Sequence, residues 1–207
     1  MSFRIIPRLD IKGPNLVKGI HLEGLRVLGQ PERFARHYYE QGADELLYMD
    51  VVASLYGRNS LVEIIERTSR EIFIPLTVGG GLRSIEDIRE VLNAGADKVS
   101  INTAAVENPE LIRQGAKAFG NQCIVLGMDV MRVEGSPVPR WQVYTHTGSD
   151  GGRPTGLDAV EWAVRAAELG AGEIVVNSID ADGTKEGYDL ELTRAISEAV
   201  NVPVVAS

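Results

Sequence analysis

Residues 74–103 read IPLTVGGGLRSIEDIREVLNAGADKVSINT, and the order of features within this stretch decides the fold class. A short apolar run passes into three glycines and then into an amphipathic stretch, which begins with Ser84 and Asp87 at the spacing of a helix capping box. The amphipathic stretch closes in Gly95, which permits a left-handed helix cap, and a second short apolar run follows. The stretch therefore predicts a strand–helix–strand unit with parallel strands and a right-handed crossover.

The same alternation extends outward over the whole chain. The apolar runs lack strict polar alternation, as expected of strands covered on both faces, and predict strands at residues 4–10, 45–50, 75–78, 98–101, 123–129, 173–178 and 203–206. Amphipathic stretches predict helices at residues 31–41, 60–71, 84–94, 109–119, 157–169 and 190–199. The alternation pauses at residues 131–156, where turn residues around a β-like piece predict a loop that contains a hairpin.

Two segments recur at one offset, which indicates two similar halves. Gly-Ala-Asp-Glu at residues 42–45 returns as Gly-Ala-Gly-Glu at 170–173 (170 − 42 = 128), and the segment at 74–78 returns at 202–206 (202 − 74 = 128). Two halves of four strand–helix units predict an α/β fold, a single (β/α)₈ TIM-barrel domain over residues 1–207. Because such barrels normally have about 250 residues, we expect this one to be truncated after the seventh strand. It would lack the following helix and the eighth unit, and the gene product would continue for roughly 40–50 residues.

Composition excludes several classes of function. The chain has 207 residues, 21 Lys and Arg, and 29 Asp and Glu, for a net charge of −8, so its overall field does not favour nucleic acid. No apolar run approaches the roughly 20 residues that span a bilayer. A single cysteine fits a reducing compartment, and we expect a cytoplasmic protein.

Aspartates at the predicted strand ends are the candidate catalytic groups. Asp10, Asp50 and Asp129 each end an apolar run, and pseudo-symmetric halves would set Asp10 and Asp129 across the barrel mouth from each other. Two carboxylates in different surroundings can divide the work of general acid and general base. The alternative is that these aspartates only cap a helix or brace a loop. The three histidines show no metal-ligand spacing, so we expect neither a metal nor a cofactor.

Glycines and hydroxyl residues at two other strand ends form candidate phosphate loops. Gly80 and Gly81 precede a helix start, and small residues there let backbone N–H groups surround a phosphate. Asn102 and Thr103 end the next strand and offer an amide and a hydroxyl. The segment Asp182-Gly183-Thr184 could serve a phosphate in the second half in the same way. The alternative is that the glycines serve only a tight turn.

These residues together resemble the cyclase subunit of imidazole glycerol phosphate synthase from the first strand to the last residue. The resemblance rests on a co-linear set of segments: RIIP at residues 4–7, VKG at 17–19, GADEL at 42–46, VGGG at 78–81, ADKVSINT at 96–103, VYT at 143–145, GAGEI at 170–174 and SIDADGTKEGYD at 178–189.

The resemblance implies an enzyme that takes ammonia from a partner glutaminase. Ammonia would enter an open-chain phosphoribulosyl-formimino aminoimidazole carboxamide ribotide, giving imidazole glycerol phosphate and aminoimidazole carboxamide ribotide. Asp10 and Asp129 would be the acid–base pair. The substrate would be held by Gly80, Gly81, Asn102, Thr103, Asp182, Gly183, Thr184, Asn177, Ser178, Asp50 and Lys18. Four charges at strand starts would form an ammonia gate, or alternatively a salt-bridge plug: Arg4, Glu45, Lys98 and Glu173.

Two departures from the family pattern keep other functions open. Arg8 stands where the family commonly has Cys, and Asn177 stands where Thr is usual. They suggest, as an alternative, a paralogous barrel that channels ammonia for sugar-nucleotide amidination in surface-polysaccharide synthesis. The sibling phosphoribosyl-formimino ribotide isomerase shares the strand-end aspartates, and a non-catalytic phosphosugar-binding barrel is a third alternative. The long loop after Asp129 favours the cyclase over the isomerase.

Overall fold

The computed structural model describes residues 3–20, 23–51, 59–147 and 152–207. Its contacts divide the chain into two compact units: Met1–Lys18 with Leu25–Ser100, and Gly19–Gly24 with Ile101–Ser207.

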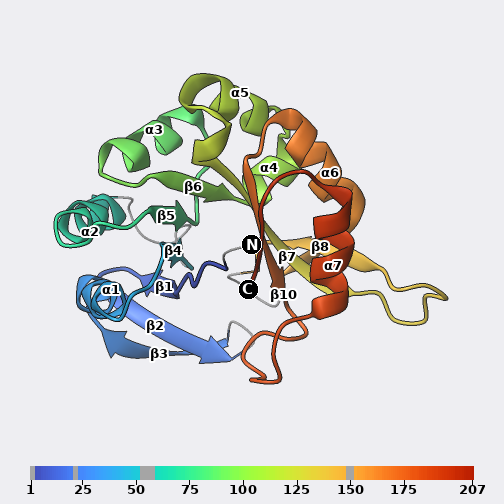
Figure 1. Ribbon diagram of the computed structural model, residues 1–207, viewed down its shortest axis with the longest axis horizontal. Helices are drawn as coiled ribbons and strands as arrows, with labels where there is room; N and C mark the ends of the chain where they lie inside the picture. Colours follow the sequence, from blue (N-terminus) through green and yellow to red (C-terminus); the bar gives the residue numbers. More distant parts are fainter. Residues whose placement is uncertain (1–2, 21–22, 52–58, 148–151) are drawn as a thin grey trace. The chain divides into compact units, whose positions relative to one another are not determined.

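The first unit is built on four parallel strands, β1, β4, β5 and β6, paired in that order. An antiparallel strand, β2, pairs with β1. Helices α1, α2 and α3 follow one another along one side of these strands (Figure 1). The elements are β1 (Arg8–Lys12), β2 (Asn15–Ile20), β3 (Glu23–Gly29), α1 (Pro31–Glu40), β4 (Leu46–Asp50), α2 (Asn59–Ser69), β5 (Leu76–Gly79), α3 (Ile85–Asn93) and β6 (Lys98–Ile101).

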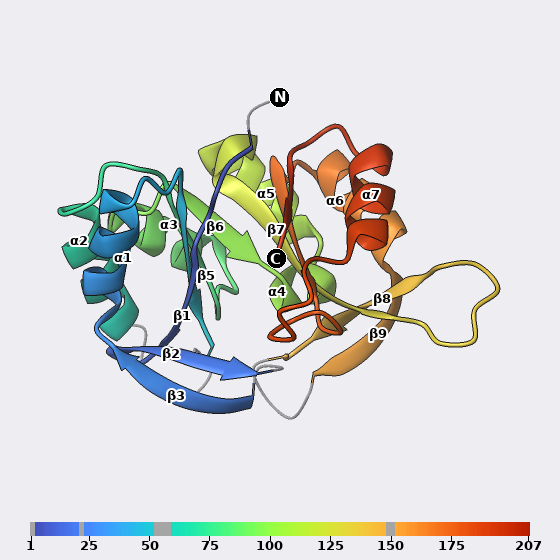
Figure 2. The same ribbon diagram turned by 60° about the horizontal axis from the view of Figure 1, so that its bottom comes forward.

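The second unit is built on three parallel strands, β7, β10 and β11, with β7 continuing into the antiparallel strands β8 and β9. Helices α5 and α6 pack on β7, and α7 packs on β11. The connection between β7 and β8 projects away from these helices (Figure 2). The elements are α4 (Thr103–Glu107), α5 (Glu110–Phe119), the 3₁₀ turn η1 (Asn121–Cys123), β7 (Ile124–Arg132), β8 (Trp141–Thr145), β9 (Arg153–Asp158), α6 (Ala159–Leu169), β10 (Glu173–Ser178), α7 (Leu190–Ala199) and β11 (Val204–Ala206).

Strand register aligns side chains into rows on one face of each sheet. In the first unit Asp10 pairs with Met49, Met49 with Gly79, and Gly79 with Ser100. Side chains alternate between the faces of a strand, so the neighbouring Tyr48 lies on the opposite face. There it is fully buried, and its hydroxyl lies 2.8 Å from that of Thr68 in α2. The row on one face thus carries Asp10 and Ser100 at its two ends, and Tyr48 on the other face packs on a helix.

Parallel strands alternating with helices confirm the predicted α/β fold of the TIM-barrel type. The predicted hairpin after the β7 strand is also present as β8 and β9. The first strand differs from its prediction because Pro7 has no N–H to donate, so the ladder begins at Arg8 rather than at residue 4. It also continues past Asp10 to a turn at Gly13, whose φ of +56° favours glycine, and pairs with β2.

No helix in the described part of the chain is long and apolar enough to cross a membrane.

Candidate active site

Asp129, near the C-terminal end of β7, is the centre of a hydrogen-bond network in the second unit. Its Oδ1 accepts a bond of 2.8 Å from the amide of Asn177, and its Oδ2 accepts bonds of 3.0 Å from the amide of Asn102 and 2.6 Å from the hydroxyl of Thr147. Register explains the first contact, because Asn177 on β10 pairs directly with Asp129. Both carboxylate oxygens are therefore bound by donors, which fixes the orientation of the group.

Asn102 and Thr103 both contact the hairpin after β7. Besides Asp129, the Asn102 amide donates to the backbone oxygen of Tyr144 at 3.3 Å. The Thr103 hydroxyl accepts from the backbone N–H of His146 at 3.1 Å. The sequence suggested a phosphate role for this pair, which stays a prediction, and the structure adds a contact between Asn102 and the carboxylate. Thr147 was not found from the sequence because it follows β8, and the local sequence does not indicate which strand β8 pairs with.

Two buried acceptors beside this carboxylate have no hydrogen-bond partner among the described residues, Asn102 Oδ1 and Asn177 Oδ1, and Ser178 Oγ, on the opposite face of β10 from Asn177, is likewise unpartnered. Asn177 and Ser178 are only 3% and 2% exposed. A buried polar atom without a partner costs about 1–3 kcal/mol, so such atoms mark places where a ligand or a solvent molecule can bind. Since both asparagines direct their NH₂ groups at Asp129, their carbonyl oxygens remain to accept from N–H or O–H groups.

Asp10, the candidate carboxylate of the first unit, has a different partner. Its Oδ1 lies 2.9 Å from Nε of Arg8, two residues earlier on β1. The two side chains are 12% and 20% exposed, respectively, so the ion pair is largely buried. Asp10 and Asp129 thus have the unlike surroundings that the sequence analysis required of an acid–base pair.

The glycine turn after β5 is held close to the end of β4. Gly80 has a φ of +99°, and a Cβ at that position would lie 2.1 Å from the backbone oxygen of Asp50. Gly81, at φ +66°, continues the turn. Glycine is therefore required for both conformation and space at Gly80. Asp50 lies at the end of β4 as predicted, and its backbone supports this turn.

The backbone N–H groups at the N-terminus of helix α3 are bonded by side chains of the same segment. The Ser84 side chain accepts from the N–H of Asp87 at 3.1 Å, and the Asp87 carboxylate accepts from the N–H groups of Ser84 and Arg83 at 3.1 and 2.7 Å. The predicted capping box is confirmed. Since these N–H groups are already bonded, a phosphate at this loop would depend on the N–H groups of the glycine turn instead.

The loop after β10 is tied to the β7–β8 hairpin. The carboxylate of Asp180 accepts from the backbone N–H of Arg132 at 2.8 Å, and that of Asp189 accepts from the indole N–H of Trp141 at 3.0 Å. Within the loop Gly183 has a φ of +74°, and the exposed Thr184 donates to the backbone oxygen of Ala181 at 2.8 Å. Asp182, Gly183 and Thr184 therefore form a local turn whose position is set by the hairpin.

Lys18 lies on β2 with an exposed side chain, next to Val17, which pairs with Asp10. The antiparallel turn between β1 and β2 brings this lysine back toward the strand that carries Asp10. No strand was predicted here from the sequence, and Lys18 was named only through the family resemblance.

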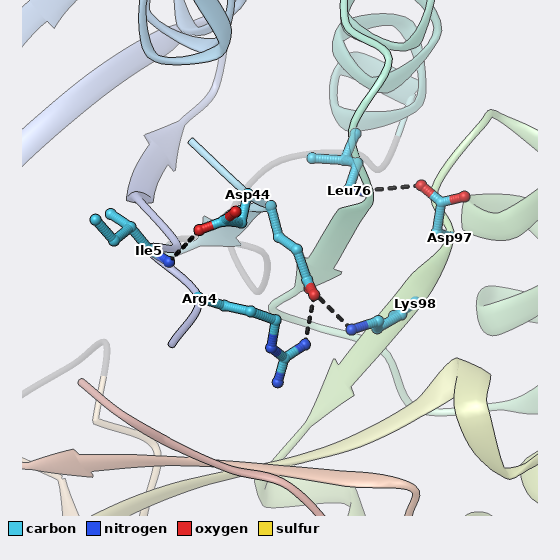
Figure 3. Close-up of polar contacts among 7 residues, drawn as sticks. Arg4, Ile5, Asp44, Leu76, Asp97 and Lys98 are labelled. Carbon is cyan, nitrogen blue, oxygen red and sulfur yellow. Dashed lines mark hydrogen bonds and ion pairs between the residues drawn. The ribbon is translucent and has the colours of Figure 1, made fainter. Parts of the chain in front are cut away.

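Charged residues at the starts of the strands form a second cluster in the first unit. The carboxylate of Glu45 is bound by Arg4 through one oxygen and by Lys98 through the other, the latter at 2.8 Å (Figure 3). Glu45 is buried, at 6% exposure. Of the four predicted gate residues, three are thus in contact with one another. Glu173 belongs to the second unit, where it begins β10 and is also buried.

Two aspartates beside this cluster have structural roles that the sequence analysis did not predict. Asp44 accepts from the N–H of Ile5 at 2.7 Å, and Asp97 accepts from the N–H of Leu76 at 2.8 Å (Figure 3). Each directly precedes a cluster residue, Glu45 or Lys98; Asp44 bonds the segment before β1, and Asp97 bonds the first residue of β5. The repeated Ala-Asp that precedes a charged residue, at positions 43–44 and 96–97, was the signal in the sequence.

Among the described residues, no group of three or more His, Cys, Asp or Glu side chains could hold a metal ion.

Comparisons with known proteins agree on a family. The family model described as "Histidine biosynthesis protein" matches residues 4–207. A protein of Legionella pneumophila named imidazole glycerol phosphate synthase subunit HisF is 55% identical over 206 residues, which cover 100% of this chain and 94% of that relative. From the family match over nearly the whole chain and this level of identity, the chain belongs to the histidine biosynthesis protein family.

Proposed function

We propose that this chain is the cyclase subunit of imidazole glycerol phosphate synthase, a lyase of histidine biosynthesis. It would use ammonia to convert phosphoribulosyl-formimino aminoimidazole carboxamide ribotide into imidazole glycerol phosphate and aminoimidazole carboxamide ribotide. The observation that carries this proposal is the 55% identity over the full chain to a relative with that subunit's name. The same identity disfavours the alternatives of a sugar-nucleotide amidination barrel, a ribotide isomerase and a non-catalytic phosphosugar-binding barrel.

Asp10 and Asp129 are the proposed acid–base pair. Closing an imidazole ring around an incoming nitrogen requires protons to leave that nitrogen and to reach the departing oxygen, which is work for a general acid and a general base. The ion pair of Asp10 and the neutral donors around Asp129 give the two carboxylates different environments, and such a difference supports a division of the two roles.

Substrate binding is proposed to draw on the strand-end loops around these carboxylates. Gly80 and Gly81 offer backbone N–H groups to a phosphate, and the Asp182-Gly183-Thr184 turn is the corresponding candidate in the second unit. The buried oxygens of Asn102 and Asn177 are free to accept from donors, and a carboxamide or an amine in the substrate would supply them. Lys18, Asp50, Thr103 and Ser178 complete the proposed set.

A glutaminase subunit is the proposed partner and source of ammonia. The contacts of Glu45 with both Arg4 and Lys98 support this part of the proposal, because ion pairs at the strand starts can separate and re-form as a gate for neutral ammonia. Glu173 would belong to the same gate. No nucleic acid or membrane partner is proposed, and we propose a cytoplasmic location.

The function is tested by replacing each acid–base residue with its isosteric amide. Asp10→Asn and Asp129→Asn should each lower the turnover of the formimino ribotide with an ammonium salt by at least about 100-fold, the scale of a lost general acid or base. Melting curves should show that both variants fold. The matched control is Glu63→Gln, an amide substitution on the exposed face of α2, where we expect wild-type turnover. Near-normal turnover in either aspartate variant would remove that residue from the mechanism, and an inactive wild type would refute the cyclase assignment.

A further inference from the structure

We propose that Arg8 is a positioning residue for Asp10, so that its removal lowers turnover through Asp10 alone; this inference rests on the proposed cyclase function. Residues two apart on a strand share a face, so Arg8 lies one step below Asp10 along β1 on the same side of the sheet. From there its Nε reaches Oδ1 of Asp10 at 2.9 Å.

The two residues that pair with Asp10 in the strand register carry no charge. In register, Asp10 lies between Met49 on β4 and Val17 on β2, and Val17 is 2% exposed. A carboxylate that is only 12% exposed and flanked by apolar side chains is costly unless a nearby cation or donor compensates it. Arg8 supplies that compensation.

The bond to Arg8 also determines which oxygen of Asp10 is available. Nε binds Oδ1, and among the described residues nothing binds Oδ2. The second oxygen therefore keeps its lone pairs for a substrate, in a direction set by the first. Asp129, in contrast, is fixed through both oxygens by amide and hydroxyl groups from three parts of the second unit. Arg8 thus orients the carboxylate of Asp10 through one charged contact. The carboxylate of Asp129 is oriented by three neutral donors, Asn102, Thr147 and Asn177.

Three variants test this role in the assay with an ammonium salt, which requires no partner subunit. In Arg8→Met, kcat should fall by about 10–100-fold with KM changed by less than about threefold, because a catalytic group that has lost its orientation slows the chemical step rather than binding. Arg8→Lys restores the charge near the position of Nε and should recover most of that loss. In the double variant Arg8→Met with Asp10→Asn, kcat should match that of Asp10→Asn alone within about twofold, because two residues that act as a unit are not additive.

Arg36→Met is the matched control. Its Nε binds the carboxylate of Glu40 at the same 2.9 Å, but on the exposed face of α1, and its loss should leave kcat unchanged. The role of Arg8 is overturned if Arg8→Met keeps wild-type kcat, or if the double variant loses activity by the product of the two single effects. Should Arg8→Met fail to fold, the Lys variant and the double variant, in which the Asp10 carboxylate is replaced as well, carry the same comparison. A wild type without ammonium-dependent turnover would instead refute the proposed function.

Discussion

At the scale of single residues, Asn177 connects two strands of the second unit through one side chain. Its amide binds Oδ1 of Asp129 at 2.8 Å, while its own oxygen is buried without a partner among the described residues. The same side chain therefore holds the carboxylate and presents an acceptor beside it. Its contribution to turnover is separable from its contribution to stability.

We expect Asn177→Ala to lower turnover by about 10-fold, because a catalytic carboxylate that is held less firmly loses alignment. The free energy of unfolding should fall by only about 1–2 kcal/mol, since the lost bond is offset by removal of the unpartnered oxygen. Steady-state kinetics and urea unfolding measure the two effects. Asn93→Ala, at an exposed position of α3, is the control and should change neither. Unchanged kinetics in Asn177→Ala would show that the Asp129 contact has no part in catalysis.

A second prediction at the scale of single residues concerns Gly80. Gly80→Ala combines an unfavourable φ of +99° with a Cβ that would lie 2.1 Å from the Asp50 oxygen, so the turn must move. Gly42→Ala, at φ +86° with nothing within 4 Å of its Cβ, isolates the conformational cost, which we expect to be about 1–2 kcal/mol. Gly80→Ala should lose clearly more than Gly42→Ala in urea unfolding. Equal losses would mean that the close approach to β4 imposes no constraint.

At the scale of elements, Tyr48 joins β4 to α2. Its ring is fully buried, and its hydroxyl pairs with that of Thr68, which is also fully buried. Burial raises the pKa of the Tyr48 hydroxyl far above its ordinary value, whereas the bond to Thr68 lowers it slightly. The strand and the helix are therefore joined by a neutral pair that must stay protonated in the folded state.

The raised pKa of Tyr48 predicts a loss of stability in alkali. Above the ordinary tyrosine pKa of about 10 the unfolded chain releases this proton while the folded chain keeps it. The free energy of unfolding should then fall with rising pH, by up to about 1.4 kcal/mol per pH unit from this residue. Urea unfolding between pH 8 and pH 11 measures the slope. Tyr48→Phe should reduce the slope, while Tyr188→Phe, at an exposed tyrosine, should not. The same slope in Tyr48→Phe as in wild type would contradict the assignment.

At the scale of the whole molecule, the proposed partner gives the charge cluster at the strand starts a use. Arg4 and Lys98 both bind Glu45, and the three residues come from separate parts of the first unit. Such a cluster either closes this end of the sheet as a fixed salt-bridge plug or opens as a gate that admits ammonia. The two roles predict different turnover only when the nitrogen comes from a second subunit, because free ammonium does not need the gate.

We expect Lys98→Met to lower glutamine-dependent turnover of the complex by at least about 10-fold, because removal of one cation leaves buried Glu45 less compensated and disturbs the gate. Turnover with an ammonium salt, which does not require the partner, should change by less than about threefold. Lys117→Met, in the last turn of α5, is the control for loss of a lysine charge. Equal losses with both nitrogen sources would favour the plug over the gate.

Much of this fold could be read from the residues because its signals are local. The strand at β5, the capping box of α3 and the strand at β6 follow from hydrophobic runs, Ser84 with Asp87, and a closing glycine. The α4 helix was not predicted because five residues are too short for a periodic pattern, and the pairing of β1 with β2 was not predicted because it is a contact between segments. The strand-end aspartates and the candidate phosphate loops were found by the same means, since strand ends can be recognised in the sequence, whereas the other candidate site residues came from the family resemblance.

The sequence by itself determined the α/β class, the strand-end position of Asp10 and Asp129, and the glycines of the turn after β5, since each depends on neighbours in the chain. Only the tertiary structure decided what surrounds those carboxylates. Arg8 and Asn177 were departures from a family pattern in the sequence, and in the structure each binds one of the two aspartates. The reason is physical: a side chain's partner depends on strand register and on which face of a strand it occupies, and register is fixed only when the strands pair.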